Sequence, residues 1–124
     1  MIKYENYRNE LLNAKLSRGL TYRQIANMMS TTYQNIQQIL TGKSMGSHES
    51  YRELEALFQP SNTFMEYTEQ FKRIFEEHEL TVESVANEIL MTELGLENII
   101  ECRHVGQRDN YRRLEVYLCK LLEI

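Results

Sequence analysis

The sequence predicts an all-α protein made of two copies of one four-helix unit. Apolar residues recur at helical spacing along the chain, which is the pattern of amphipathic helices. The sequence also matches itself when it is shifted by sixty residues, which indicates an internal repeat. A single proline and the absence of low-complexity tracts argue against long disordered segments.

The internal repeat aligns residues 7–55 with residues 67–115 without a gap. Twelve of the 49 aligned pairs are identical, whereas roughly three would be expected by chance at ordinary amino-acid usage. Apolar character is kept at other pairs, such as Ile25 with Val85. We therefore predict two domains, residues 1–59 and 60–124, with the boundary at the proline-containing segment.

The periodic stretches place the helices of each unit in order. In the first unit we expect helices over about residues 4–17 and 48–58, with two short helices between residues 20 and 43. In the second unit the expected ranges are 64–78, 82–89, 92–102 and 108–123. The last helix carries an apolar surface wider than one core needs, formed by Tyr111, Leu114, Tyr117, Leu118, Leu121 and Leu122.

The stretch from residue 20 to residue 43 predicts a helix-turn-helix. Two short apolar faces flank a break at residues 30–32. Thr21 and Thr32 can each cap a helix, because a threonine hydroxyl accepts a hydrogen bond from an orphan N–H of the first turn. Gly42 is expected to end the second helix. Two short helices joined in this way have helix-turn-helix geometry.

This stretch resembles the helix-turn-helix of the lambdoid phage repressor and Cro family, which also covers many bacterial regulators. The resemblance is carried by a small residue, four apolar positions and a closing tripeptide: Ala26, Ile25, Met29, Ile36, Ile39 and Thr41-Gly42-Lys43. One departure is Ser30, where that family usually has glycine at the turn; serine can still adopt the turn, more often with strain. The resemblance implies a DNA-binding domain whose second helix, about Thr32–Leu40, enters the major groove.

The second helix of this motif displays amides and a tyrosine away from its apolar positions. Gln and Asn can bond bidentately to adenine N6 and N7, so this face has the chemistry to read bases. The candidate base contacts are Tyr33, Gln34, Asn35, Gln37 and Gln38. By analogy with the family, Tyr33, Gln34 and Gln38 occupy the positions that usually reach base edges. The alternative is a neutral surface that only faces water.

Phosphate contacts are expected beside this helix. By analogy with the family, the candidates are Tyr22, Arg23 and Lys43, together with Thr32 at the start of the helix. Charge agrees with this interpretation, since the chain from residue 11 to residue 48 holds four basic residues and no acid. A phosphate backbone tolerates such a surface and is repelled by an acidic one.

The second copy has lost this chemistry. At the positions that match the candidate base contacts it has Glu93, Leu94, Gly95, Glu97 and Asn98. Residues 1–60 have seven basic and five acidic side chains, net +2, whereas residues 61–124 have seven and thirteen, net −6. Eight glutamates lie between residues 76 and 101 and would repel phosphates. We therefore expect the second copy to form a dimer or partner contact through Tyr117, Leu118, Leu121 and Leu122.

The sequence contains no motif that predicts a catalytic site, a metal site or a membrane-spanning helix. It has no nucleophile elbow, phosphate-binding glycine loop or dinucleotide fingerprint, and its carboxylates lie along helix faces as solvated charge, so we expect no enzyme and no cofactor. Cys102 and Cys119 are expected to be reduced packing residues, and no metal site is expected. With no membrane-spanning run and no signal peptide at its start, an intracellular, cytoplasmic protein is expected.

Two functions from different classes follow. The first is a sequence-specific transcription regulator, such as a phage-like repressor, that binds double-stranded DNA as a homodimer. The second is a protein-binding adaptor or inhibitor of phage or mobile-element type, whose acidic second copy binds a basic protein. Those glutamates could instead serve solubility alone, and a helical domain that binds no nucleic acid is a third alternative. The sequence specifies no operator, effector or direction of regulation.

Overall fold

Eight α-helices and no strand make up the described part of the chain, residues 1–123 of a computed structural model. The prediction of an all-α protein is confirmed. None of the helices in this range combines the length and the apolar character needed to cross a bilayer. The helices are α1 (Tyr4–Ser17), α2 (Tyr22–Asn27), α3 (Tyr33–Thr41), α4 (His48–Phe58), α5 (Phe64–Glu77), α6 (Val82–Ile89), α7 (Glu93–Ile100) and α8 (Arg108–Leu122).

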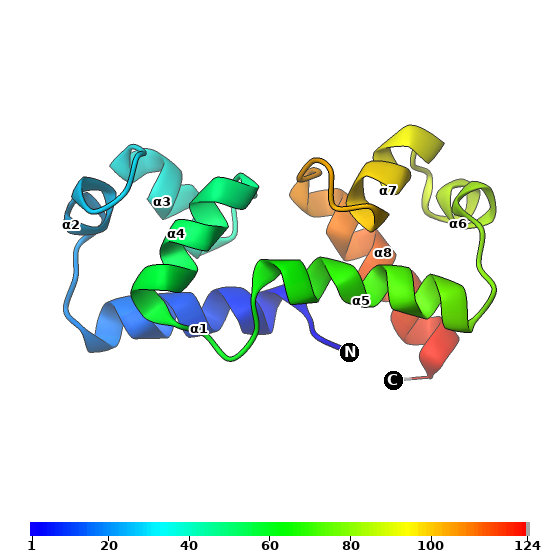
Figure 1. Cartoon of the computed structure of the whole chain (residues 1–124), viewed down its shortest axis with the longest axis horizontal. Coiled ribbons are helices and arrows are strands. Elements are labelled where there is room, and N and C mark those ends of the chain that lie inside the picture. Colours follow the sequence, from blue (N-terminus) through cyan, green and yellow to red (C-terminus); the bar gives the residue numbers. More distant parts are fainter. Residues whose placement is uncertain (124) are drawn as a thin grey trace.

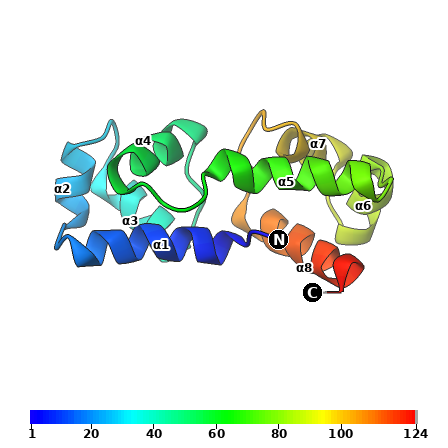
Figure 2. The same cartoon turned by 60° about the horizontal axis from the view of Figure 1, so that its bottom comes forward.

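The helices form two halves that lie end to end (Figure 1). The amino-terminal half holds α1 to α4 and the carboxy-terminal half holds α5 to α8. Corresponding helices begin sixty residues apart, at residues 4 and 64, 22 and 82, 33 and 93, and 48 and 108. α1 and α5 start in the middle of the molecule and run to opposite ends, where α2 and α6 lie, as Figure 2 also shows. The proposed boundary segment, residues 59–63, joins α4 to α5.

Side-chain caps set the limits of α2 and α3. Thr21 Oγ1 accepts from the Gln24 N–H at 3.1 Å, while Gln24 Oε1 accepts from the Thr21 N–H at 2.8 Å, which is a capping box. Thr32 Oγ1 accepts from the Asn35 N–H at 3.3 Å. Gly42 ends α3 in the left-handed region, with φ of +80°. These three predicted helix limits are confirmed.

The turn between α2 and α3 differs from the expectation for Ser30. This residue does not adopt a positive φ, so the strain expected of serine at a glycine position does not arise. α2 ends early, at Asn27, and the Ser30 N–H donates to Glu53 Oε2 of α4 at 3.1 Å. At the matching position of the carboxy-terminal half, Leu90 has a φ of +58° and ends the longer α6.

One cluster of buried side chains runs through both halves. Where the halves meet, the cluster is aromatic: the rings of Tyr51 and Phe64 stack with their centroids 4.1 Å apart. The centroids of Tyr4 and Tyr67 lie 5.8 Å apart, and those of Tyr7 and Phe64 lie 6.1 Å apart. Aromatic pairs at such distances contribute about 0.5–1.5 kcal/mol each beyond the area they bury. The two halves therefore share a core.

Two half-buried carboxylates tie each half to the other. Glu55 accepts from the Tyr7 hydroxyl of its own half and from the first N–H of α5. Glu115 accepts from the Tyr67 hydroxyl of its own half and from the first N–H of α1. Burial first, and then the adjacent carboxylate, raises the pKa of both tyrosines, so both stay protonated donors. The expectation that the carboxylates are solvated charge is wrong for this pair.

Candidate nucleic-acid interface

α3 presents amide side chains to solvent from a firmly buried helix. It packs against α1 and α2 through a face with no measurable exposure, formed by Ile36, Ile39 and Leu40. Its exposed side carries Gln34, Gln37 and Gln38. Each of these amides offers a carbonyl acceptor and an NH₂ donor at the surface, which is what base reading in the major groove requires.

Three of the five candidate base contacts are engaged within the protein. Asn35 is half-buried, and its Nδ2 donates to Thr31 Oγ1 at 2.8 Å. Tyr33 is also half-buried, and the guanidinium of Arg23 lies over its ring at 4.4 Å from the centroid. This cation–π pair joins the first turn of α2 to the first turn of α3. The side chains presented without such contacts are those of Gln34 and Gln37, whereas Gln38 Oε1 accepts from Ser44 Oγ at 3.2 Å.

The candidate phosphate contacts lie around the ends of α2 and α3. Arg23 and Lys43 are exposed, the second of them directly after the residue that ends α3. Tyr22 is half-buried, with the ammonium of Lys15 over its ring at 4.3 Å. The Thr32 hydroxyl oxygen serves as the α3 cap, which leaves its O–H free to donate.

Two contacts to this motif come from distant helices and carry no local sequence signal. The Arg8 guanidinium of α1 donates to the carbonyl of Leu40 in the last turn of α3, where cations are favoured. Glu53 of α4 brings a carboxylate beside the α2–α3 turn. Because both partners are more than twenty residues away along the chain, only the packing of the helices reveals them.

The matching surface of the carboxy-terminal half is acidic and apolar. Leu90 and Leu94 are 82% and 65% exposed, at the positions that match Ser30 and Gln34. Glu93 is exposed, and Glu97 pairs with Arg103 at 3.0 Å. α7 therefore offers carboxylates and leucines where α3 offers amides.

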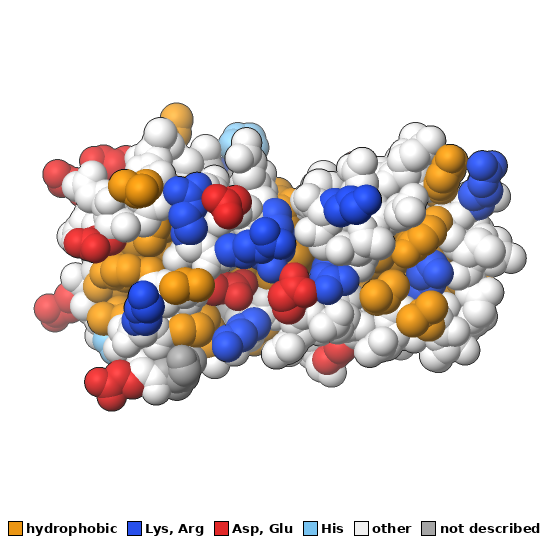
Figure 3. Space-filling view, turned by 180° about the vertical axis from the view of Figure 1, so that it is seen from behind, with side chains coloured by type: hydrophobic (Ala, Val, Ile, Leu, Met, Phe, Trp, Pro, Cys, Tyr) orange, Lys and Arg blue, Asp and Glu red, His pale blue; other side chains and the backbone are white. Residues whose placement is uncertain are grey.

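The candidate dimer residues on α8 divide into two groups. Leu118 is 0% exposed and lies inside the core, so it cannot contact a second chain, which corrects the prediction for this residue. Leu121 is exposed, and Tyr117 and Leu122 are half-buried against the core. Val116, which was not among the candidates, is also exposed. Figure 3 shows apolar side chains gathered with charged ones on this face of the carboxy-terminal half.

No family model, curated protein or solved structure matches this chain. The likeness of the α2–α3 segment to the lambdoid repressor and Cro family therefore rests on the residues of that segment.

The described residues, 1–123, contain no group of three His, Cys, Asp or Glu side chains arranged to hold a metal ion. Cys102, which lies near His104 in sequence, contacts Thr68 instead, with its Sγ 3.0 Å from Thr68 Oγ1.

Proposed function

We propose that this chain is a sequence-specific DNA-binding transcription regulator of the repressor type, built as a tandem pair of four-helix helix-turn-helix units. The observation that carries the proposal is the exposed amide face of α3, held on a fully buried apolar face. Glutamine side chains in this setting can pair with adenine in the major groove. Arg23, Thr32 and Lys43 would position the helix on the phosphates, with Tyr22 at the start of α2.

The repeat supports the tandem arrangement. Residues sixty apart begin corresponding helices, and matched residues make matched bonds: the Gly46 N–H donates to the Tyr51 hydroxyl and the Gly106 N–H to the Tyr111 hydroxyl, both at 3.1 Å. In this proposal the amino-terminal unit reads DNA. The glutamates of the carboxy-terminal unit repel the DNA phosphates, so α7 does not enter a DNA groove.

A homodimer is part of the proposal, because one small domain makes too few contacts for tight, specific binding. Leu121 and Val116, with Tyr117 and Leu122 beside them, supply an apolar face on α8 for the second chain. Two α3 helices would then address half-sites about one helical turn apart.

The test is selection of bound duplexes from a random DNA pool, followed by affinity measurements on the selected duplex. An inverted repeat is expected, since a twofold dimer reads both half-sites alike. Gln34→Ala should weaken binding by about 1–3 kcal/mol, roughly 5- to 150-fold, because a bidentate base contact is lost. Asn13→Ala removes an exposed amide from α1 and is the matched control, with unchanged binding expected.

Equal binding by wild type, Gln34→Ala and Gln38→Ala would contradict the assignment of α3 as the reading helix. A pool that yields no enriched sequence would contradict sequence-specific DNA binding altogether.

A protein-binding adaptor or inhibitor is the second candidate, and one observation favours it. The carboxy-terminal half exposes Leu90 and Leu94 beside Glu93, an apolar and acidic surface suited to a basic protein partner. The two candidates differ in which half carries the activity. Substitutions on α3 weaken DNA binding in the first candidate, whereas substitutions at these leucines weaken binding of the protein partner in the second.

A further inference from the structure

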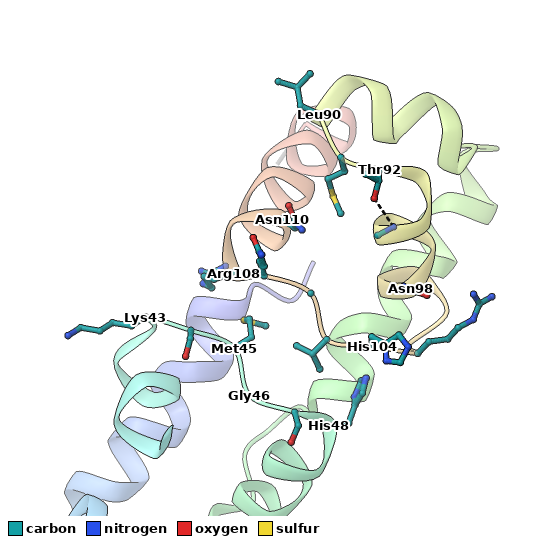
Figure 4. Close-up of a pocket in the computed structure, with 18 residues that line it drawn as sticks. Lys43, Met45, Gly46, His48, Leu90, Thr92, Asn98, His104, Arg108 and Asn110 are labelled. Carbon is teal, nitrogen blue, oxygen red and sulfur yellow. Dashed lines mark hydrogen bonds between the residues drawn. The ribbon is translucent and has the colours of Figure 1, made fainter. Parts of the chain in front are cut away.

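A cleft of about 1020 Å³ lies between the two halves. Figure 4 shows the loop between α3 and α4 on one side of it, facing the loop between α7 and α8. Residues 43–48 line it from the first loop and residues 103–108 from the second. These two segments are sixty residues apart, so the cleft is formed by the same part of each half.

The lining of this cleft is basic. It contains Lys43, Arg103 and Arg108, together with His48 and His104. Among the described residues that line it, none is Asp or Glu, although the chain has 18 acidic residues against 14 basic ones. A cleft with one sign of charge concentrates the field and attracts ions of the opposite sign.

The second loop carries two arginines in a half whose net charge is negative. Arg103 stands where the first loop has Lys43, and Arg108 stands where it has His48. His104 adds an imidazole side chain, at the position of a serine. The run of glutamates in the carboxy-terminal half stops at residue 101, directly before this loop. Both walls of the cleft therefore carry basic side chains, although α7 carries glutamates at positions that match amides of α3.

Two helices begin at the cleft, each with one carboxylate in its first turn, Glu49 in α4 and Asp109 in α8. α4 begins at residue 48 and α8 begins at residue 108, and the residues at both starts line the cleft. The N-terminus of a helix carries a partial positive charge and unpaired N–H groups. α8 has 15 residues, and the side chain of Gln107, the residue before it, makes no capping hydrogen bond. The side chain of Gln107 therefore does not occupy the N–H groups at the start of α8.

The cationic groups are only partly neutralised by the protein. Arg108 is 7% exposed and bonds Glu5 at 2.8 Å, while its Nε and Nη1 have no hydrogen-bond partner among the described residues. Arg103 pairs with Glu97 outside the cleft. His48 Nε2 is also buried without a partner, and burial, followed by the charges of Arg52 and His104, lowers the pKa of His48. The side chains that an anion in the cleft can reach are the exposed ones, Arg103 and His104 of the second loop and Lys43 of the first.

The cleft is continuous with the amide face of α3. Lys43 follows the end of that helix and lines the cleft, and Ser44, which also lines it, bonds the exposed Gln38. We infer that the cleft binds the phosphate backbone of the duplex whose major groove α3 reads. This inference rests on the proposed function, and it assigns DNA contacts to the carboxy-terminal half through Arg103 and His104.

The test measures the affinity for the selected duplex at several salt concentrations. Arg103→Gln should lower the slope of log affinity against log salt by about 0.9, because one phosphate contact is lost. The ratio of the wild-type affinity to the affinity of this variant should therefore shrink about 3.5-fold between 50 and 200 mM salt. The same ratio of affinities is expected on a random duplex, because phosphate contacts carry no sequence information.

Arg112→Gln is the matched control, since Arg112 is exposed on α8 and lies outside the cleft; its slope should equal that of wild type. His104→Glu is a second variant at an exposed position, and a carboxylate in the cleft should weaken binding at least as much as Arg103→Gln. Thermal unfolding of each variant verifies that the fold is intact.

The outcomes separate the two proposals. If Gln34→Ala loses affinity while Arg103→Gln and Arg112→Gln share the wild-type slope, the cleft inference is overturned and the proposed function stands. If inorganic phosphate shifts the cleft resonances in an NMR titration but Arg103→Gln leaves the duplex slope unchanged, the cleft binds free anions only and the inference is again overturned. Failure of the chain to bind any duplex overturns both.

Discussion

Glu5 shows how a single surface residue supports a buried charge. Its carboxylate bonds Arg8 at 2.7 Å and Arg108 at 2.8 Å, and the second of these guanidiniums is buried over the ring of Tyr4, 4.6 Å from its centroid. Hydrogen bonds from Arg8 first, and then from Arg108, lower the pKa of Glu5 to about 2. Glu5 and Arg108 are 103 residues apart, so the sequence alone predicts neither this pair nor its role.

The ion pairs of Glu5 with Arg8 and Arg108 should make the free energy of unfolding depend on pH. A carboxyl with a depressed pKa stabilises the fold above its ordinary value of 4.5, and this contribution is lost as the pH falls toward about 2. Glu5→Gln should therefore be less stable than wild type at pH 7, with a difference that shrinks as the pH falls from 4.5 to 2. Urea denaturation across this range measures the difference, with the exposed Glu69→Gln as control. A difference independent of pH would show that Glu5 acts without its charge.

At the scale of the helix, the sequence predicts most of the architecture. α1, α4 and α6 have the predicted limits, because apolar periodicity and short-range caps are local properties of the chain. α7 ends at Ile100 rather than near residue 102, where Cys102 adopts a φ of +56°. The α2–α3 turn depends on Glu53 from α4, a tertiary contact, and so its conformation could not be read from the segment itself.

The capping box of α2 gives a prediction at this scale. Thr21→Ala removes the acceptor for the Gln24 N–H and should lower the free energy of unfolding by about 1 kcal/mol. Thr21→Asn should recover this stability, since asparagine is at least as good an N-cap. The midpoints of urea denaturation, compared at equal m-values, measure the stability of both variants. Equal losses in the two variants would mean that Thr21 contributes by packing rather than by capping.

The candidate site could be predicted in part. The exposure of Gln34, Gln37 and Gln38 follows from their positions opposite the apolar residues of α3, which periodicity identifies. The engagement of Asn35 and Tyr33, in contrast, depends on the conformation of the turn and on Arg23. The basic cleft also escapes prediction, because its two walls are brought together only when the halves pack.

At the scale of the whole molecule, the halves are joined by matched bonds that cross between them. Glu55 and Glu115 are identical residues sixty positions apart, and each accepts a hydrogen bond from the first N–H of the first helix in the other half. The repeat predicts two similar units but does not show how they pack. The only sequence signal for these crossing bonds is that both positions hold glutamate. The local sequence around each glutamate does not indicate which residue it bonds.

Glu55→Ala tests whether these bonds hold the halves together. The substitution leaves the Tyr7 hydroxyl and the first N–H of α5 without an acceptor, so the free energy of unfolding should fall by about 2–4 kcal/mol. Glu115→Ala should cost a similar amount. Glu69→Ala, an exposed change on α5, should stay within about 0.5 kcal/mol of wild type. Urea denaturation gives the values, and a Glu55→Ala variant as stable as Glu69→Ala would refute the role of the crossing bonds.

The short connection between α4 and α5 has a consequence for how the two halves stay together. Residues 59–63 tether the aromatic surfaces of the halves to each other, and a short flexible tether gives an effective concentration on the order of millimolar. Dilution in a cell therefore cannot separate them, as it could separate two independent chains. The two halves therefore stay packed together although their outer surfaces differ, with amides on α3 and with glutamate and leucine on α7.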